Sequence, residues 1–387
     1  MARFALTSRR FLLRRPYLQA GRAAPSVIRT FATESNQPPK QQQQQQYTAA
    51  PSDRIKLVEV GPRDGLQNEK GIISLDTKLQ LIERLAKAGL NNIEAGSFVS
   101  PKWVPQMDNS SQILTHLLTT PPKSPSPLTF SFLAPNGKGL SNALEILSSH
   151  PDSYSTASPT PSKPAVELAI FTSATESFSR KNLNSSVAQS LDTYRQVIQS
   201  AKDHNPSSPL RVRAYISVVL GCPFEGYDVS PHRVAEIATE LLEMGADEIA
   251  LGDTTGMGTA PRTKELLTCL RAAGLRNEDV AMHFHDTYGQ ALVNIAVALE
   301  HGIRVFDVSV GGLGGCPYSP GATGNVATED VVYFLESLGM DTGVDLDAVA
   351  DCGEWISKEV GRGYASTVGR AVLGSRRRKA EEEGKKE

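Results

Sequence analysis

Eight short apolar runs recur along the chain with amphipathic segments between them, and this alternation constrains the fold more than any other feature of the sequence. Apolar runs of this length are typical of buried strands. The eight runs are residues 55–60, 93–95, 128–133, 165–171, 212–220, 248–251, 280–284 and 305–310. Strands that alternate with helices in this number, over about 290 residues, predict a closed (β/α)8 TIM barrel.

The segments between the runs carry helix start and stop signals. Ser74 is placed to cap a helix before the second run, and Ser230 to cap one before the sixth run, where Pro231 takes the first helical position. Gly245 follows the end of that second helix, where glycine is a common terminator. These signals support helices between successive strands, as the barrel requires.

A doubly wound sheet is the alternative arrangement of alternating strands and helices. In its nucleotide-binding form, a glycine-rich phosphate-binding turn follows the first strand. Here the first run is followed by Gly-Pro-Arg-Asp-Gly over residues 61–65, which does not match G-x-G-x-x-G. We therefore predict a barrel over residues 53–343, with a helical extension over 344–375.

The two ends of the chain differ in composition from the predicted barrel. Residues 1–33 hold seven arginines and no Asp, Glu or Lys, which predicts a mitochondrial presequence and a location in the matrix. The alternative is a basic arm that binds an anionic partner. Residues 34–52, with their glutamine run, are predicted to be a disordered linker, and residues 376–387 a disordered charged tail.

Composition argues against several classes of function. A formal net charge of -2 over 387 residues argues against a nucleic-acid-binding protein. No apolar run reaches the roughly 18 residues of a membrane span. The four cysteines show no C-x-x-C spacing, which indicates reduced thiols rather than a disulfide framework.

His283 and His285 flank Phe284 at the end of the seventh predicted strand. Alternate residues of a strand face the same side, and these two Cα atoms are expected about 7 Å apart. Two imidazoles in this arrangement can bind one metal ion. The alternative is a pair of histidines that are satisfied separately at a strand end.

Other polar side chains stand where predicted strands end, which is where barrel enzymes carry their reactive groups. These residues are Arg63, Asp64, Gln67, Glu94, Asn136, Arg213, Asp253, Thr254 and, in a glycine-rich loop, Asn325. Buried charges are costly unless they are paired or coordinated. Their convergence with the two histidines therefore indicates a metal ion or an anionic substrate.

Four motifs of the chain closely resemble those of the 3-hydroxy-3-methylglutaryl-CoA lyase family. They are EVGPRDGLQNEK at 59–70, SFVSPKWVPQM at 97–107, HFHDTYGQ at 283–290 and GGLGGCPYSPGATGN at 311–325. The resemblance implies divalent-metal-dependent cleavage of that acyl-CoA thioester to acetyl-CoA and acetoacetate, in leucine degradation and ketone-body formation. It also implies a homodimer.

The resemblance implies that Mg²⁺ or Mn²⁺ is bound by Asp64, His283, His285 and Asn325. Mixed oxygen and imidazole donors suit a hard or borderline ion. Each oxygen donor has an alternative role. Asp64 lies in Pro-Arg-Asp-Gly, which is a favourable turn sequence, and Asn325 follows a glycine where it can cap a helix.

The implied reaction is a retro-Claisen cleavage. Asp64 is a candidate for the base that takes the proton of the metal-bound alcohol, and Arg63 would hold the enolate oxygen that develops. Arg63 could instead be a surface arginine paired with Glu69. Glu94 is expected to orient Arg63 or relay a proton, or to be no more than a buried ion-pair partner.

Further residues have less specific expected roles. Asp253 is expected to steer a metal-bound histidine, or else to cap a helix. Cys316 is implied to protonate the enolate, although a cysteine is more often a small buried apolar residue. Gln67, Arg213 and Thr254 are expected to contact the substrate. The complete expected catalytic set is Arg63, Asp64, Glu94, Asp253, His283 and Cys316.

Two other functions fit parts of the sequence. A related acetyl-CoA-dependent Claisen synthase, of the isopropylmalate or homocitrate type, would share the barrel, the Arg-Asp pair and both histidines. A barrel kept as a binding protein would be expected to have lost a metal ligand, and all four expected ligands are present.

Overall fold

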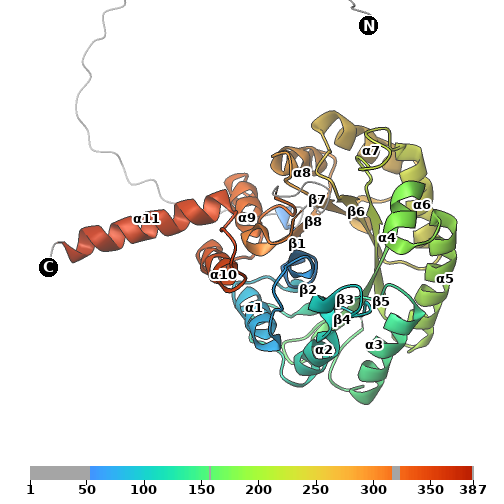
Figure 1. Cartoon of the computed structure of the whole chain (residues 1–387), viewed down its shortest axis with the longest axis horizontal. Coiled ribbons are helices and arrows are strands. Elements are labelled where there is room, and N and C mark those ends of the chain that lie inside the picture. Colours follow the sequence, from blue (N-terminus) through green and yellow to red (C-terminus); the bar gives the residue numbers. More distant parts are fainter. Residues whose placement is uncertain (1–52, 157, 316–322, 386–387) are drawn as a thin grey trace, which may run out of the picture. The chain divides into compact units, whose positions relative to one another are not determined.

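The computed structural model describes residues 53–156, 158–315 and 323–385, and at its centre lies a closed barrel of eight strands (Figure 1). Every neighbouring pair is parallel, and β8 closes the barrel by pairing with β1. The strands are β1 (Lys56–Glu59), β2 (Asn92–Ser97), β3 (Thr129–Leu133), β4 (Ala165–Ser173), β5 (Arg211–Ser217), β6 (Glu248–Asp253), β7 (Val280–Phe284) and β8 (Val305–Val308). The predicted (β/α)8 barrel is confirmed, and the doubly wound alternative is excluded. The predicted presequence and linker lie outside the described residues.

Helices surround the barrel and continue beyond it. They are α1 (Leu75–Lys87), α2 (Ser110–Thr119), α3 (Gly137–Ser149), α4 (Glu176–Leu183), α5 (Val187–Asp203), α6 (Pro231–Glu243), α7 (Ala260–Ala272), α8 (Ala291–Glu300), α9 (Thr328–Ser337), α10 (Leu346–Glu359) and α11 (Thr367–Gly384). The predicted caps are confirmed, since Ser74 Oγ accepts from Thr77 N at 3.0 Å and Ser230 Oγ from Arg233 N at 3.4 Å. Within the described ranges, no helix combines the length and apolar character needed to cross a membrane.

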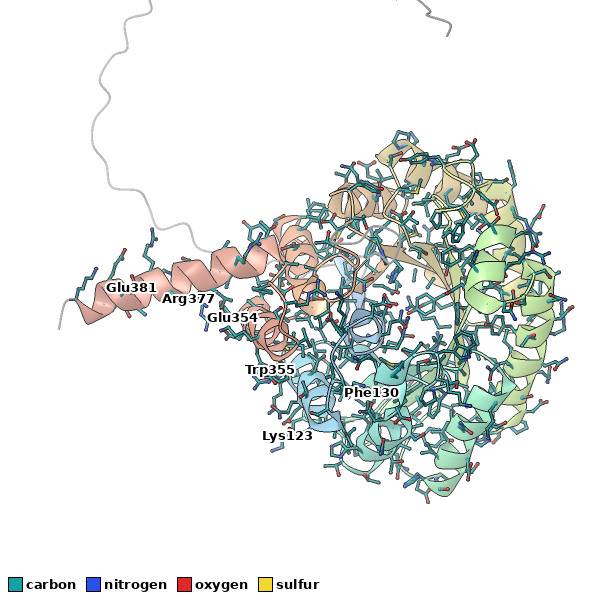
Figure 2. The ribbon with its side chains drawn as sticks, in the orientation of Figure 1. Lys123, Phe130, Glu354, Trp355, Arg377 and Glu381 are labelled. Carbon is teal, nitrogen blue, oxygen red and sulfur yellow. The ribbon has the colours of Figure 1, made fainter. Side chains whose placement is uncertain are left out.

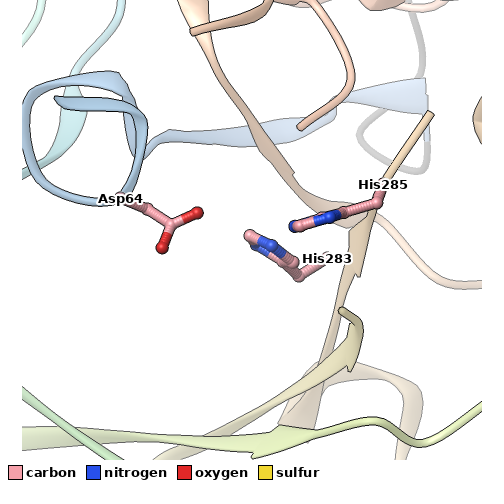
Figure 3. Close-up of side chains that lie close together, drawn as sticks. All are labelled: Asp64, His283 and His285. Atoms are coloured by element: carbon pink, nitrogen blue, oxygen red, sulfur yellow. The ribbon is translucent and has the colours of Figure 1, made fainter. Parts of the chain in front are cut away.

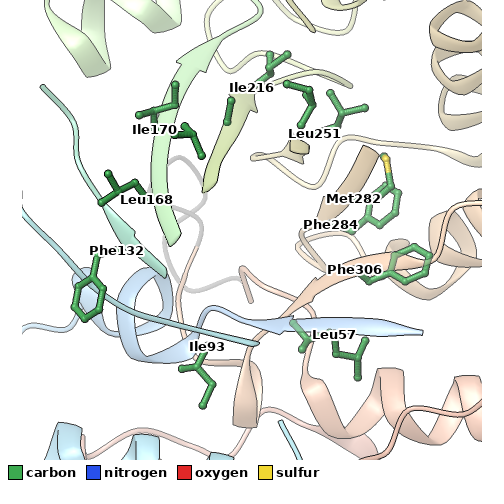
Figure 4. Packing of buried hydrophobic residues seen from close by; sticks show 14 of the residues in the cluster. Leu57, Ile93, Phe132, Leu168, Ile170, Ile216, Leu251, Met282, Phe284 and Phe306 are labelled. Atoms are coloured by element: carbon green, nitrogen blue, oxygen red, sulfur yellow. The ribbon is translucent and has the colours of Figure 1, made fainter. Parts of the chain in front are cut away.

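The alternation of side chains along the strands separates the packed core from the site. Met282, Phe284 and Phe306 lie in the apolar layer between the barrel and its helices (Figure 4). Successive strand residues face opposite sides of a sheet. His283 and Asp307, which alternate with these apolar residues, therefore face the barrel interior, where their Cα atoms are paired across β7 and β8.

The helical extension packs against the start of the barrel. The guanidinium of Arg84 in α1 lies 4.3 Å from the ring centroid of Trp355 in α10. Trp355 is labelled in Figure 2. The barrel and the helices that follow it belong to one compact unit. Residues far from the strands in sequence can therefore support the barrel mouth.

The C-terminal tail differs from its predicted disorder. Residues 376–384 form the last turns of α11, which projects away from the barrel in Figure 1. Arg376 donates to both carboxylate oxygens of Asp351 at 3.0 and 3.1 Å, and Arg377 pairs with Glu354 (Figure 2). Charge alone suggested disorder, but Ala, Arg, Lys and Glu are strong helix formers, and extending a helix that is already nucleated costs little.

Candidate metal centre and active site

A π-helical turn over Gly61–Gly65 carries Arg63 and Asp64 from the end of β1 across the barrel mouth. The turn is held at its start by Glu59, whose Oε1 accepts from Gly61 N at 2.8 Å. Both ends require glycine, because a Cβ on Gly61 would lie 2.5 Å from Glu59 Oε1 and one on Gly65 would lie 2.8 Å from a neighbouring Cβ. The turn therefore fixes where the Arg-Asp pair points.

Arg63 is fixed by two carboxylates and an aromatic ring. Its Nη1 donates to Asp64 Oδ1 at 2.7 Å and its Nη2 to Glu94 Oε2 at 2.6 Å, and its guanidinium carbon lies 5.5 Å from the ring centroid of Tyr215. Burial lowers the pKa of Arg63, but the charges of Glu94 and Asp64 outweigh burial and raise it. The surface-pair alternative is wrong, since Arg63 is 7% exposed and Glu69 pairs with Arg362 at 3.1 Å.

Asp64, His283 and His285 meet at the mouth (Figure 3). Each offers a ligand atom, and these atoms all lie within 4.8 Å of one another. The two imidazole centroids are 5.2 Å apart. The alternating strand pattern predicted that both histidines face the same side and meet Asp64, and these distances confirm that arrangement.

A carboxylate from the neighbouring strand orients His283. Its Nδ1 lies 3.1 Å from Asp307 Oδ2, which leaves Nε2 to act as a ligand. Burial disfavours the charged form of His283, but the hydrogen bond and charge of Asp307, together with the charge of Asp64, outweigh burial and raise its pKa. Burial and the charge of His283 lower the pKa of His285 to about 3, so His285 is neutral near pH 7 and suited to bind a cation.

Asn325 reaches the same point from the far side of the glycine-rich loop. Its backbone forms an isolated bridge with His285, and its Nδ2 donates to Asp64 Oδ2 at 2.9 Å and to Leu313 O at 3.2 Å. The helix-cap alternative is wrong, because α9 begins at Thr328 and Ala327 precedes it as the cap residue.

Two unpaired atoms show how well this group suits a cation. Among the described residues, His285 Nδ1 and Asn325 Oδ1 are buried and have no hydrogen-bond partner. Leaving a buried polar atom unpaired costs about 1–3 kcal/mol. A divalent ion coordinated by such donors would offset that cost. Carboxylate, amide oxygen and imidazole form a donor set that hard or borderline ions accept.

Comparison with known proteins identifies the family. The HMGL-like family profile matches residues 54–356. The chain belongs to the HMGL-like family. It is 47% identical over 320 residues to the 3-hydroxy-3-isohexenylglutaryl-CoA/hydroxy-methylglutaryl-CoA lyase of Pseudomonas aeruginosa, which covers 83% of this chain and 97% of that protein. It is 45% identical over 319 residues to the mitochondrial hydroxymethylglutaryl-CoA lyase of Rattus norvegicus. That match covers 82% of this chain and 90% of the rat protein.

Solved structures of this family have the same fold. The crystal structure of hydroxymethylglutaryl-CoA lyase from Pseudomonas aeruginosa superposes with a TM-score of 0.74 at 46% identity, covering 84% of this chain and 98% of that one. The structure of an HMG-CoA lyase from Acinetobacter baumannii, solved with coenzyme A and 3-methylmalate, superposes with a TM-score of 0.72 at 32% identity. The match covers 84% of this chain and 96% of that one. The resemblance seen in the four sequence motifs is therefore confirmed.

Gln67 and Glu94 each contact one member of the Arg-Asp pair. Gln67 Nε2 donates to Asp64 Oδ1 at 2.9 Å, so it supports the carboxylate directly. Glu94 accepts from Arg63 and, at 3.2 Å, from the Tyr215 hydroxyl, while its second oxygen Oε1 is buried without a partner among the described residues. Glu94 therefore lies where it orients Arg63, as one of its predicted roles required.

Arg213 is not placed to contact a substrate, which corrects the prediction for it. Its side chain is 1% exposed, and its three nitrogens donate to Glu248, Tyr215 and Asp307 at 2.6 to 3.2 Å. These bonds occupy the guanidinium below the mouth. Arg213 instead holds Asp307, and through it His283.

Asp253 forms no hydrogen bond to a histidine of the described residues, and Thr259 precedes α7 as its cap residue, so the structure supports neither predicted role of Asp253. Both of its oxygens accept from Gly258 N at 3.1 Å, so it closes the loop after β6. Burial raises the pKa of Asp253 to about 7.

Thr254 supports the loop after β5. Its Oγ1 accepts from Val218 N at 3.0 Å, and Val218 has a φ of +58°. Cys316 lies outside the described residues.

Sequence reasoning missed Asp307 and Tyr215. Both carry a signal that was available, since each is a polar residue that alternates with apolar neighbours in a strand, in Val-Phe-Asp-Val and in Ala-Tyr-Ile. Such residues point into a barrel rather than toward its helices. Tyr215 links the two halves of the site, because its ring packs edge-on at 6.2 Å from His283 and beneath Arg63.

Asp307→Asn is expected to weaken Mn²⁺ binding by about 10- to 100-fold, as losses of a carboxylate behind a metal-binding histidine do elsewhere. The amide keeps the size of the side chain but removes the charge that fixes His283. Mn²⁺ affinity measured by electron paramagnetic resonance checks this, with Asp351→Asn, at an exposed ion pair of α10, as the matched control. Wild-type affinity in a folded Asp307→Asn protein would contradict the role given to Asp307.

Proposed function

We propose that the chain is a metal-dependent lyase that cleaves 3-hydroxy-3-methylglutaryl-CoA into acetyl-CoA and acetoacetate. The observation that carries this proposal is the meeting of Arg63 and Asp64, from the end of β1, with His283 and His285, from the end of β7. Relatives named as lyases of this substrate share 45–47% identity over more than four fifths of the chain.

The proposed cation is Mg²⁺ or Mn²⁺, held by Asp64, His283, His285 and Asn325. When bound, such an ion lowers the pKa of a coordinated hydroxyl and polarises a coordinated carbonyl oxygen. Burial raises the pKa of Asp64, but the charges of Arg63 and His283 and the hydrogen bond from Asn325 outweigh burial and lower it. The carboxylate is therefore ionised at neutral pH and available to a cation.

The bonds that change are confined to one carbon–carbon link of the substrate. Loss of the proton from the 3-hydroxyl lets that oxygen form a ketone while the bond between C2 and C3 breaks. The bonding pair moves into the thioester as an enolate, and protonation at C2 gives acetyl-CoA. The ketone fragment leaves as acetoacetate, so atoms and electrons balance without an oxidant or reductant.

Arg63 is the residue we assign to the enolate oxygen. Its two terminal nitrogens are fixed by Asp64 and Glu94, while its Nε is buried without a partner among the described residues. A guanidinium held in place before reaction stabilises charge that develops only in the transition state. Tyr215 beneath it and Glu94 beside it keep that charge at the mouth.

Removal of the hydroxyl proton is assigned to Asp64, and return of a proton to the enolate to Cys316. Asp64 lies beside both imidazoles, as a base acting near the cation must. The assignment of Cys316 rests on the family resemblance of the loop at 311–325. Glu94 would serve as a positioning residue for Arg63. Gln67 and Thr254 remain candidates for contacts with the substrate.

The location and assembly of the protein are part of this proposal. We place the protein in the mitochondrial matrix, because residues 1–33 have the composition of a presequence and the rat relative is mitochondrial. The bacterial relative is similar to the same degree, so the composition of the leader supports the location more than the likeness does. We also propose a homodimer, on the family resemblance alone.

The purified protein with Mg²⁺ or Mn²⁺ is expected to convert 3-hydroxy-3-methylglutaryl-CoA into equal amounts of acetyl-CoA and acetoacetate. Both products can be quantified by coupled dehydrogenase and thiol assays. A parallel reaction with acetyl-CoA and a series of 2-oxo acids tests the synthase alternative. Condensation without cleavage would replace the lyase assignment, and a lack of both reactions would favour a binding protein.

A further inference from the structure

The segment that joins α10 to α11 lies against the glycine-rich loop that follows β8. Arg362 in this segment donates from Nη1 to Gly314 O at 3.1 Å and from Nη2 to Gly312 O at 3.3 Å. The same Nη1 lies 3.1 Å from Glu69 Oε1, just after the turn that carries the Arg-Asp pair. One side chain from outside the barrel therefore ties together the loops that follow β1 and β8.

The described part of the glycine-rich loop, residues 311–315, depends on such outside contacts for its conformation. Gly311, Gly312 and Gly314 have φ angles of +64°, +62° and +103°, in the left-handed region that glycine adopts most readily. Glycine backbone has the largest conformational freedom to lose on ordering. The groups that bind its carbonyls and amides therefore decide which conformation is populated.

Movement of this loop would move Asn325. Asn325 Nδ2 donates to Leu313 O at 3.2 Å, and a Cβ on Gly314 would lie 2.8 Å from that same nitrogen. Asn325 Nδ2 also donates to Asp64 Oδ2 at 2.9 Å. The carbonyls held by Arg362 flank the residue that holds Asn325, so the position of Asn325 Oδ1 depends on Arg362.

Tyr364 holds the other end of the loop through a buried carboxylate. Its hydroxyl donates to Glu329 Oε1 at 2.8 Å, and Glu329 accepts from Gly311 N at 3.0 and 3.1 Å. Its ring fits between Gly353 of α10 and Gly369 of α11, where neither position has room for a Cβ. The ring is thus built into the extension, and the hydroxyl is aimed at the loop.

We propose that Arg362 and Tyr364, here called the C-terminal brace, are positioning residues that hold the glycine-rich loop so that Asn325 can complete the cation site. This inference rests on the proposed function in assigning the site its cation. The brace itself does not touch the cation or the substrate. Through the brace, the packing of the C-terminal helices fixes the position of the loop at the mouth of the barrel.

The test compares Mn²⁺ affinity and turnover in full-length variants. Arg362→Ala is expected to raise the dissociation constant for Mn²⁺, measured by electron paramagnetic resonance, by about tenfold, and to lower kcat while KM for the thioester changes little. Arg362→Lys keeps one donor group and should recover part of the affinity. Tyr364→Phe keeps the ring and loses only the hydroxyl, and should weaken Mn²⁺ binding by about fivefold.

Two matched variants serve as controls. Arg376→Ala removes an exposed arginine that joins α11 to α10, and Tyr333→Phe removes an exposed hydroxyl on α9. Both should bind Mn²⁺ as the wild type does. Wild-type affinity in Arg362→Ala and Tyr364→Phe, or an equal loss in Arg376→Ala, would overturn the brace.

The same measurements separate the brace from the proposed function. Wild-type protein that binds Mn²⁺ but forms no acetoacetate would refute the reaction, while the affinities of the variants would still decide the brace. Wild-type protein that binds no Mn²⁺ at all would overturn both. A graded series, from wild type through Arg362→Lys to Arg362→Ala, would support the brace, since rescue by a conservative variant is not expected of a merely structural residue.

Discussion

Arg63→Gln is expected to lower kcat for thioester cleavage by about 10²-fold or more, with little change in KM. Glutamine retains hydrogen-bonding capacity and much of the length of the side chain but removes the fixed positive charge. Charge appears on the thioester oxygen only as the carbon–carbon bond breaks, so the loss should fall on the chemical step rather than on binding. Steady-state rates over a range of thioester concentrations measure the two constants separately.

The size of this effect follows from how firmly Arg63 is held. Asp64 and Glu94 fix its terminal nitrogens at 2.7 and 2.6 Å before any substrate is present, so no reorganisation is needed during reaction. Arg63→Lys is expected to be nearly as slow, because one ammonium group cannot reproduce the forked geometry. Arg276→Gln, at an exposed arginine paired with Glu278 and Asp279, is the control. A folded Arg63→Gln enzyme within threefold of the wild-type rate would refute the enolate assignment.

His285→Ala is expected to weaken Mn²⁺ binding by more than about 100-fold and to abolish turnover at low metal concentration. Removing a ligand should cost more than removing a residue behind a ligand, for which losses of about 10- to 100-fold are usual. His285 is suited to the role because burial and the neighbouring charge of His283 lower its pKa to about 3, and its Nδ1 has no protein partner among the described residues. Initial rates measured across a series of Mn²⁺ concentrations check the expectation.

Partial recovery at high Mn²⁺ would identify the defect in His285→Ala as one of metal affinity. His232→Ala, at an exposed histidine of α6, should match the wild type at every concentration. A rate in His285→Ala equal to that of the wild type at low Mn²⁺ would remove His285 from the ligand set. An unfolding temperature close to that of the wild type is needed in each variant, because His285 is buried and its truncation leaves a cavity in the packed barrel mouth.

Much of the fold was predictable because strand patterns and helix caps are local. The pattern Val-Ala-Met-His-Phe-His over 280–285 gives both the strand and the shared direction of the two histidines. The barrel then follows from counting such runs, and the meeting of residues 64, 283 and 285 follows from the rule that strand ends converge on one face.

How deep an inward-facing side chain lies in the barrel was not predictable from the sequence. The wrong predictions for Arg213 and Asp253 arise from this. Arg213 and His283 both point inward, but Arg213 pairs in register with Glu248 at the start of β6, whereas His283 pairs with Asp307 near the end of β8. A polar residue at either depth looks alike in sequence, since tilt and register of the strands decide which one reaches the mouth. For the same reason Asp253 was expected to orient a metal-bound histidine, whereas the carboxylate that orients His283 is Asp307.

The contribution of the C-terminal helices was also beyond sequence reasoning. Nothing in the sequence around Arg362 or Tyr364 indicates that these side chains reach loops that begin some 50 residues earlier. Such contacts depend on the angle at which α10 packs, which side-chain shape decides. The glycines at 353 and 369, which make room for the tyrosine ring, were recognisable only once the ring was seen between them.

The central claim is that one divalent cation bound by Asp64, His283, His285 and Asn325 is required for cleavage. The most direct test is to titrate metal-stripped wild-type protein with Mn²⁺, counting bound ion and measuring acetoacetate formation in the same samples. The site predicts one tightly bound Mn²⁺ per chain, a rate that rises in proportion to occupancy, and loss of both in His283→Ala. Full turnover with chelator present and no ion bound, or unchanged occupancy in His283→Ala, would contradict the claim.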